Sequence, residues 1–195
     1  MNIRPYLMLM LLLPILSCSS CKDDIDGYGP FKDHFPVEFN FKSIDNEIST
    51  RIYTKDGVDI EFTLPEREIE LNKQMETAQK QITYIKLLGP DQSEIKGKYL
   101  DGVTEVILDA PYTLSGSQYT FSKDLITQKL TYNANRIEDT LTMRGICCVR
   151  YNNGVKKDRS TTIQVSGYTL ADEKSETQAG DTLYYREFDV KLVKK

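Results

Sequence analysis

The stretch that does most to set the expected fold is ISTRIYTKDGVDIEFTL, residues 48–64. Its two halves alternate apolar or β-branched residues with polar ones, the period of a half-buried strand. A two-residue Asp56-Gly57 loop would place Ile52 opposite Glu61. A three-residue loop that includes Lys55 pairs Ile52 with Ile60 and brings the apolar faces together, with Gly57 in the left-handed position of this loop class. We therefore predict a hairpin with the three-residue loop.

Similar strand patterns recur on both sides of this hairpin. Gly-, Pro- and Asn-rich turns separate many of them, at residues 89–91, 115–116 and 152–154. Eight to ten strands with polar connections favour a mostly-β fold, and we expect an antiparallel β-sandwich, immunoglobulin-like or related. A closed antiparallel β-barrel is the alternative. The expected strands are residues 37–41, 82–88, 104–108, 118–122, 128–132, 140–151, 161–170 and 182–193.

One segment is better suited to a helix. Leu71, Met75, Ala78 and Ile82 have helical spacing, and residues 63–66 could form a capping box. The alternative for this segment is a short edge strand. We expect residues 66–81 to form the single helix of the domain, and we expect residues 152–160 and 171–180 to face solvent.

The first residues have the features of a secretory signal. Arg4 is followed by an apolar run over residues 7–16 and then by Ser17 and Cys18. The run is too short to cross about 30 Å of hydrocarbon as a permanent helix. It is also apolar on every side, so it lacks the stripe of an amphipathic helix packed on a core. We therefore predict a signal peptide over residues 1–17.

Residues 15–18 (Ile-Leu-Ser-Cys) resemble the lipobox of bacterial lipoproteins, in which the signal peptidase cuts before the cysteine and its thiol is acylated. This resemblance implies lipid attachment at Cys18. Cys21 is the alternative acceptor, but the residues before it lack the expected aliphatic side chain. Two or three acyl chains, each methylene contributing about 0.8 kcal/mol, would hold the protein firmly in a membrane.

The residues after these cysteines resemble the surface-export signal of Bacteroidota lipoproteins, in which a lysine precedes acidic residues. Lys22, Asp23 and Asp24 match that pattern. The resemblance implies an outer-membrane location with the domain on the extracellular face. We expect a flexible acidic tether over residues 18–33 and a single β-rich domain over residues 34–195.

Composition and charge narrow the possible partners. The chain has 195 residues, of which 39% are hydrophobic and 28% charged, so it can bury a core without disulfide or metal staples. Arg4 is the only charged residue of the leader, so its removal leaves 24 basic and 29 acidic residues. This acidic balance argues against a nucleic-acid partner.

Few residues are suited to catalysis. His34 is the only histidine, which excludes metal sites built on two or three histidines, and we interpret it as a surface residue. Adjacent strand residues point to opposite faces, so Cys147 and Cys148 indicate a strand buried on both sides. Of Tyr184 and Tyr185, we expect one to face the core and one the outside. A glycosidase-type carboxylate pair is defined by separation in space, so the sequence leaves that possibility open.

We expect a non-catalytic binding or accessory module, held at the membrane by its lipid and bound to a protein or glycan partner. We expect no cofactor and no metal. A structural or adhesive subunit that assembles by strand addition is one alternative, and a carboxylate-dependent hydrolase is another.

Overall fold

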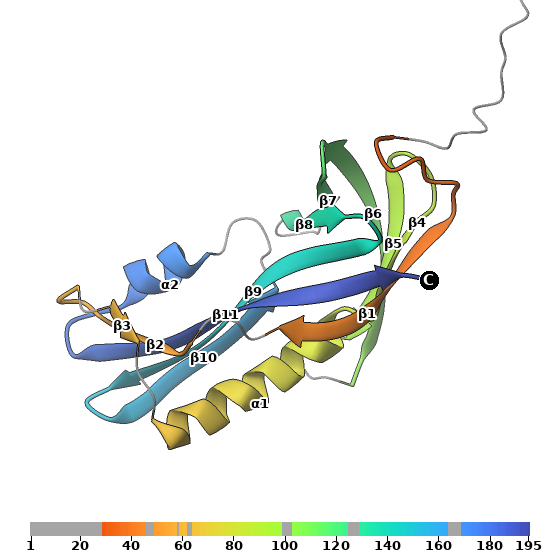
Figure 1. Ribbon diagram of the computed structural model, residues 1–195. Helices are drawn as coiled ribbons and strands as arrows, with labels where there is room; N and C mark the ends of the chain where they lie inside the picture. Colours follow the sequence, from red (N-terminus) through yellow and green to blue (C-terminus); the bar gives the residue numbers. More distant parts are fainter. Residues whose placement is uncertain are drawn as a thin grey trace, which may run out of the picture. The chain divides into compact units, whose positions relative to one another are not determined.

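The computed structural model describes residues 29–45, 49–57, 59–61, 64–98, 103–124, 129–163 and 169–195 (Figure 1). The chain divides into two compact units, Met1–His34 and Phe35–Lys195. The described part of the first unit contains a turn in which the Lys32 amide donates to the Gly29 carbonyl at 3.2 Å. The second unit carries every helix and strand discussed below.

The second unit is mostly β, as predicted. Its described residues form one eleven-stranded antiparallel sheet and two helices. The strands are β1 (Val37–Asp45), β2 (Arg51–Thr54), β3 (Asp59–Glu61), β4 (Tyr84–Leu87), β5 (Gln92–Lys98), β6 (Glu105–Ser115), β7 (Gln118–Asp124), β8 (Lys129–Ile137), β9 (Thr140–Asn152), β10 (Val155–Ile163) and β11 (Asp181–Lys194). The helices are α1 (Pro65–Gln81) and α2 (Leu170–Glu176).

Eight of the strands close into a barrel, in the order β1-β4-β5-β6-β7-β8-β9-β11 and back to β1. The closed antiparallel barrel, which the sequence left as the alternative, is therefore the observed arrangement. Of the predicted β-sandwich, the mostly-β content and the antiparallel pairing are confirmed, and the sandwich arrangement is not. Alternation along a strand determines which face is buried, but it does not determine whether the first and last strands of a sheet meet.

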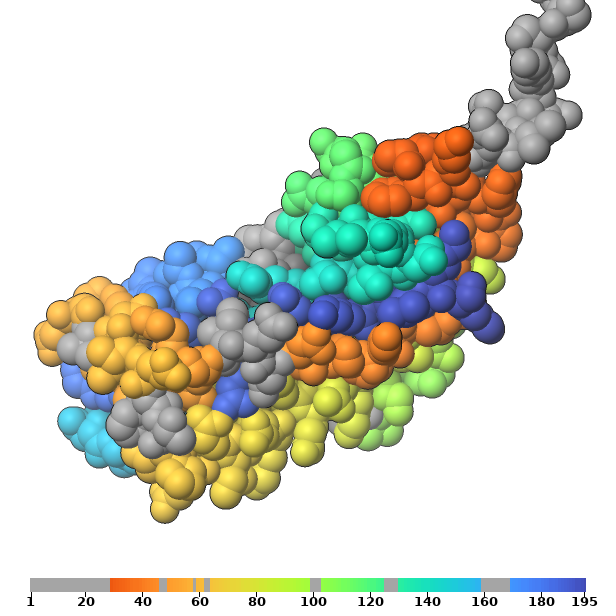
Figure 2. All heavy atoms as spheres, viewed as in Figure 1, coloured from red at the N-terminus to blue at the C-terminus, as the bar shows by residue number. Residues whose placement is uncertain are grey.

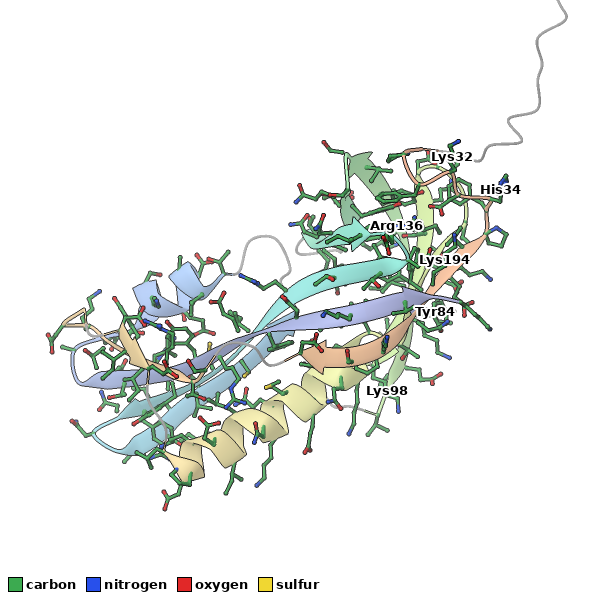
Figure 3. All side chains as sticks on the ribbon, in the orientation of Figure 1. Lys32, His34, Tyr84, Lys98, Arg136 and Lys194 are labelled. Atoms are coloured by element: carbon green, nitrogen blue, oxygen red, sulfur yellow. The ribbon has the colours of Figure 1, made fainter. Side chains whose placement is uncertain are left out.

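The barrel interior is lined by alternate residues of these strands. Aromatic rings from β6 and β7 pack there, with the Tyr112, Tyr119 and Phe121 centroids 5.5–5.9 Å apart. Arg136 of β8 is buried among them (Figure 3): it lies over the Phe39 ring and donates to the Tyr119 hydroxyl at 3.1 Å. Further buried positions of this interior are Val37, Ile85, Leu87, Ile95, Ala110, Ala134, Leu141, Met143, Val190 and Leu192.

Strands β9 and β11 are long enough to belong to two structures at once. They pair over their full lengths, from Asp181↔Asn152 to Val193↔Thr140. Near the Thr140 end they complete the barrel. Towards the Asn152 end β9 pairs instead with β10, and β11 pairs with β2. The result is an open extension of the barrel, in the order β10-β9-β11-β2-β3 (Figure 1).

The two helices cover opposite faces of this extension (Figure 1). Residues of α1 contact the Arg186 and Tyr151 side chains on one face. Residues of α2 contact Arg150, on the other face because side chains alternate along a strand. Beneath α2 lies an apolar cluster of Ile146, Cys148, Leu183 and Tyr185, against which Leu170 and Tyr53 pack.

Two glycines permit close approaches, Gly145 on β9 and Gly97 on β5 of the barrel wall. A Cβ on Gly145 would lie 2.3 Å from the Phe188 ring, and one on Gly97 would lie 1.7 Å from the Gln81 carbonyl oxygen. Gly97 thus allows the end of α1 to lie directly on β5, where the Thr83 amide donates to the Lys96 carbonyl at 2.7 Å.

Several local predictions are confirmed. Ile52 pairs with Ile60, and Gly57 has φ +85°, as the three-residue loop requires. The three predicted turns all connect neighbouring strands, and α1 occupies the segment expected to be helical. Its N-cap, however, is Leu64, without a side-chain cap hydrogen bond, so the expected capping box is wrong.

Other local predictions need correction. The expected strand over residues 161–170 is correct only at its start, since β10 begins earlier, at Val155, and ends at Ile163. It is wrong at Leu170, which begins α2, and residues 164–168 lie outside the described part. α1 is not the single helix. The segment 171–180 is not uniformly exposed, since Glu173 and Thr177 in it are buried. Strand β5 was missed because two of its three inward positions are Ser93 and Gly97, which give no apolar alternation.

Candidate functional site

The residues singled out for lipid attachment and export lie outside the described part of the chain. These are Cys18, the alternative Cys21, and Lys22, Asp23 and Asp24. Lipidation and export therefore remain predictions. His34 lies in the described part of the first unit and its side chain is exposed, in line with its interpretation as a surface residue.

The adjacent cysteines are buried on opposite faces of β9, as interpreted from the sequence. The Cys147 thiol donates to the Arg186 carbonyl at 3.7 Å. Burial raises the pKa of Cys147 to about 12, which outweighs the opposing effect of the nearby Arg186 charge. The thiolate is the nucleophilic form, so burial leaves Cys147 with little of its reactive form at neutral pH.

The densest polar arrangement of the extension is on the α2 face, where four side chains converge from four elements. We call Arg51 (β2), Asp59 (β3), Lys174 (α2) and Tyr185 (β11) the Asp59 cluster. Its carboxylate accepts from Lys174 at 2.5 Å, from the Tyr185 hydroxyl at 2.7 Å and from Arg51 at 2.8 Å. In Figure 2 the atoms of β2 and β3 (amber) lie beside those of α2 (light blue).

Aromatic rings complete this cluster. The Lys174 ammonium lies 4.9 Å from the centroid of the Tyr185 ring and 5.2 Å from that of Tyr53. Such cation–π contacts add attraction without a further anion. Arg51, Asp59 and Lys174 keep between a quarter and two fifths of their side-chain surface exposed, so the cluster reaches the protein surface.

The electrostatics of the cluster hold each group in its neutral-pH charge state. Burial favours the protonated form of Asp59, but hydrogen bonds from Lys174, Arg51 and Tyr185 outweigh it and keep the pKa of Asp59 well below its ordinary value. Burial, and then the hydrogen bond to Asp59, raise the pKa of Tyr185. Burial would lower the pKa of Lys174, but its bonds to Asp59 and Tyr185 raise it overall.

A general acid or base needs a pKa near the working pH. Asp59 is made a weaker base, Tyr185 a weaker acid, and Lys174 a poorer nucleophile. The arrangement therefore favours binding or mechanical fastening over proton transfer.

A second charged group ties α2 to β9. The Arg150 guanidinium and the Glu173 carboxylate, 2.8 Å apart, are 8% and 4% exposed, which makes this a buried ion pair. Asp158 of β10 and Glu176 of α2 also contact Arg150, at 3.1 and 3.5 Å, from largely exposed positions. The sequence had indicated only a solvated run of charge around Glu173, and the correction follows from the position of Arg150 beneath it.

On the α1 face the pattern is similar. Arg186 is buried and bonds Glu68 and Asn72 of α1, as well as Thr50 at 2.7 Å. The expectation that one of Tyr184 and Tyr185 faces outside is wrong, because Tyr184 is half-buried on the α1 face and Tyr185 is buried on the α2 face. Alternation placed the rings on opposite faces correctly, but both faces carry a helix.

Sequence reasoning did not single out Arg51, Asp59 or Lys174 as a site. Asp59 is 8 residues from Arg51 and 115 residues from Lys174 along the chain. Nothing in the local patterns around these residues indicates that they meet. The one available signal was the predicted hairpin register, which places Asp59 opposite Tyr53.

Comparisons of the chain with protein-family models, curated proteins and solved structures gave no match. Within the described ranges, neither helix combines the length and apolar character needed to span a bilayer. The same ranges contain no group of three or more His, Cys, Asp or Glu side chains placed to hold a metal ion.

Proposed function

We propose that the protein is a lipid-anchored, non-catalytic binding or accessory module, displayed on the extracellular face of the outer membrane. The anchor rests on the resemblance of residues 15–18 to a lipobox, and the surface location rests on Lys22, Asp23 and Asp24. The non-catalytic role is supported by one arrangement: the Asp59 carboxylate accepts from Lys174, Tyr185 and Arg51 at once, and these bonds hold the pKa of Asp59 well below its ordinary value.

The alternative chemistry, hydrolysis by a carboxylate pair, finds little support in this cluster. A retaining or inverting glycosidase needs one carboxyl group with a raised pKa as the acid. The Asp59 carboxylate is bound by two cations, which has the opposite effect. An accessory role with a protein or glycan partner is consistent with the part-exposed Arg51 and Lys174 side chains and the half-buried Tyr53 ring around a fixed carboxylate.

The anchor is tested by metabolic labelling with a palmitate analogue in the native cells. Cys18→Ala should abolish labelling and release the protein from the membrane, while Cys21→Ala should leave both unchanged. Labelling that persists in Cys18→Ala but disappears in Cys21→Ala would move the attachment to Cys21. Labelling lost in neither variant would refute the anchor.

The binding role is tested by exposing intact cells to a protease and then to a chemical cross-linker. We expect the domain to be cleaved from outside and to cross-link to a partner in its native membrane. Hydrolysis of a glycan panel by the purified full chain, abolished by Asp59→Asn, would instead establish an enzyme.

A second function, assembly by strand addition, is favoured by β10. This strand is the end of the sheet order, so its outer edge has no strand beside it among the described elements. Exposed lysines and a bulge between Lys156 and Asp158 protect one half of that edge. A synthetic peptide of residues 155–163 should then block self-association in solution; a full chain that remains monomeric at every concentration contradicts this function.

A further inference from the structure

The helix α2 is fastened to the domain in an unusual way. Glu173 is the one residue of its seven that is buried, and its apolar contribution to the cluster beneath is the half-buried Leu170. By contrast, α1 buries Leu71, Met75 and Ala78. Seven residues are too few for a helix to be stable alone in water, so α2 depends on its contacts with the sheet.

The polar contacts of α2 with the sheet are mainly ionic. Glu173 and Glu176 bond Arg150 of β9, and Lys174 bonds Asp59 of β3. We call the Arg150–Glu173 and Lys174–Asp59 pairs the α2 latch. A capping box made by Thr169 and Asp172 supports the helix from within, but it does not attach it to the sheet.

Ion pairs and buried apolar area respond differently to salt. The range of attraction between exposed charges falls from about 10 Å at 0.1 M salt to about 3 Å at 1 M, and buried ion pairs are screened much less. Burial of apolar surface is not weakened by screening. The barrel and α1 rest on apolar cores. The part-exposed Lys174–Asp59 pair is therefore the salt-sensitive half of the latch, and the buried Arg150–Glu173 pair is the less salt-sensitive half.

We propose that α2 is an ion-pair-latched flap, which opens while the barrel and α1 stay folded and thereby uncovers the apolar cluster of Ile146, Cys148, Leu183 and Tyr185. Local openings of this kind involve elements with little buried apolar contact. This inference goes beyond the anchoring and binding role proposed above and does not depend on lipidation.

The cysteines provide a matched pair of reporters, because Cys148 lies in the cluster under α2 and Cys147 lies on the α1 face. The test uses the full chain in mild detergent. Amide hydrogen exchange is followed over residues 169–178 and over β9 and β11, together with thiol labelling in Cys147→Ala and Cys148→Ala backgrounds.

We expect the α2 amides to exchange faster than those of β9 and β11, and to accelerate several-fold from low to 1 M salt. Glu173→Gln should raise α2 exchange about a hundredfold, since the buried Arg150 loses its buried carboxylate and keeps only the largely exposed Asp158 and Glu176 as charge partners. Cys148 labelling should rise in parallel and Cys147 labelling should not.

Asp59→Asn and Asp45→Asn form a matched control pair. Asp45 makes a similarly exposed ion pair with Lys191 between β1 and β11. Asp45→Asn should therefore leave the amide exchange rate of α2 unchanged, whereas Asp59→Asn should increase that rate. If α2 exchanges at the same rate as β9 and β11 at every salt concentration, or Cys148 is labelled no faster than Cys147, the proposal is wrong. The salt series on the unmodified chain decides the question even if Glu173→Gln does not fold.

Discussion

Replacing Gly97 with alanine tests the most demanding contact in the fold. The added Cβ would lie 1.7 Å from the Gln81 carbonyl oxygen, 2.6 Å from its carbon and 3.2 Å from the Ile82 Cα. Non-bonded Cβ atoms essentially never come closer than 3.0 Å. Since the atoms in the way belong to the backbone, the end of α1 must move away from β5 by more than 1 Å.

The cost of that movement can be assembled from the structure. Overpacking of a well-packed site costs about 1–3 kcal/mol. The shift also stretches the hydrogen bond from the Thr83 amide to the Lys96 carbonyl, worth about 1 kcal/mol. We therefore expect Gly97→Ala to lower the free energy of unfolding by about 3 kcal/mol, out of about 5–15 kcal/mol for a typical domain.

Urea denaturation followed by circular dichroism measures this change. With a slope of about 2 kcal/mol per molar urea, the midpoint should fall by about 1.5 M. Gly89→Ala is the control, because no atom lies within 4 Å of its added Cβ and its φ is not positive. A Gly97→Ala midpoint within experimental error of the Gly89→Ala midpoint would refute the close approach of α1 to β5.

Three further predictions concern titrating groups and one turn. Hydrogen bonds from Asn152 and the Gln178 amide lower the pKa of Asp181 to about 2. The contribution of Asp181 to stability is therefore present at neutral pH and is lost as the pH falls from about 5 towards 2. Asn152→Ala should flatten this loss in acid-unfolding curves, and an unchanged curve would contradict the role of Asn152. The hydrogen bond to Glu94 raises the pKa of Tyr84 to about 12. Glu94→Gln should lower this pKa, measured by ultraviolet titration with Tyr84→Phe as the reference. An unchanged pKa would refute the hydrogen bond. Gly57→Ala should cost about 1–2 kcal/mol in urea denaturation because Gly57 has φ +85°; a neutral result would mean that the loop differs.

Local patterns were sufficient for the features that depend on neighbouring residues. The alternation of Val37 and Phe39 with polar residues correctly predicts β1, and the loop ending at Gly57 correctly predicts the register of β2 with β3. Both results follow from the twofold period of strand side chains and from the positive φ that glycine tolerates.

Two elements, β5 and α2, were not predicted because their sequences show no apolar periodicity. In β5 the inward residues Ser93 and Gly97 are small, since the Ser93 hydroxyl bonds the Ala110 carbonyl and α1 occupies the space beside Gly97. In α2 the buried residue is Glu173, which is paired with an arginine rather than packed on a core.

By itself, the sequence determined the mostly-β content, the main turns and the presence of α1, because each depends on residues close together in the chain; the exported leader stays a prediction from the same kind of local pattern. Only the tertiary structure decided that the sheet closes into a barrel, since closure needs β11 to pair with β1 and β9 at once. The same holds for the Asp59 cluster. The attraction between Asp59 and Lys174 depends on their distance in space, and 115 residues of chain separate them.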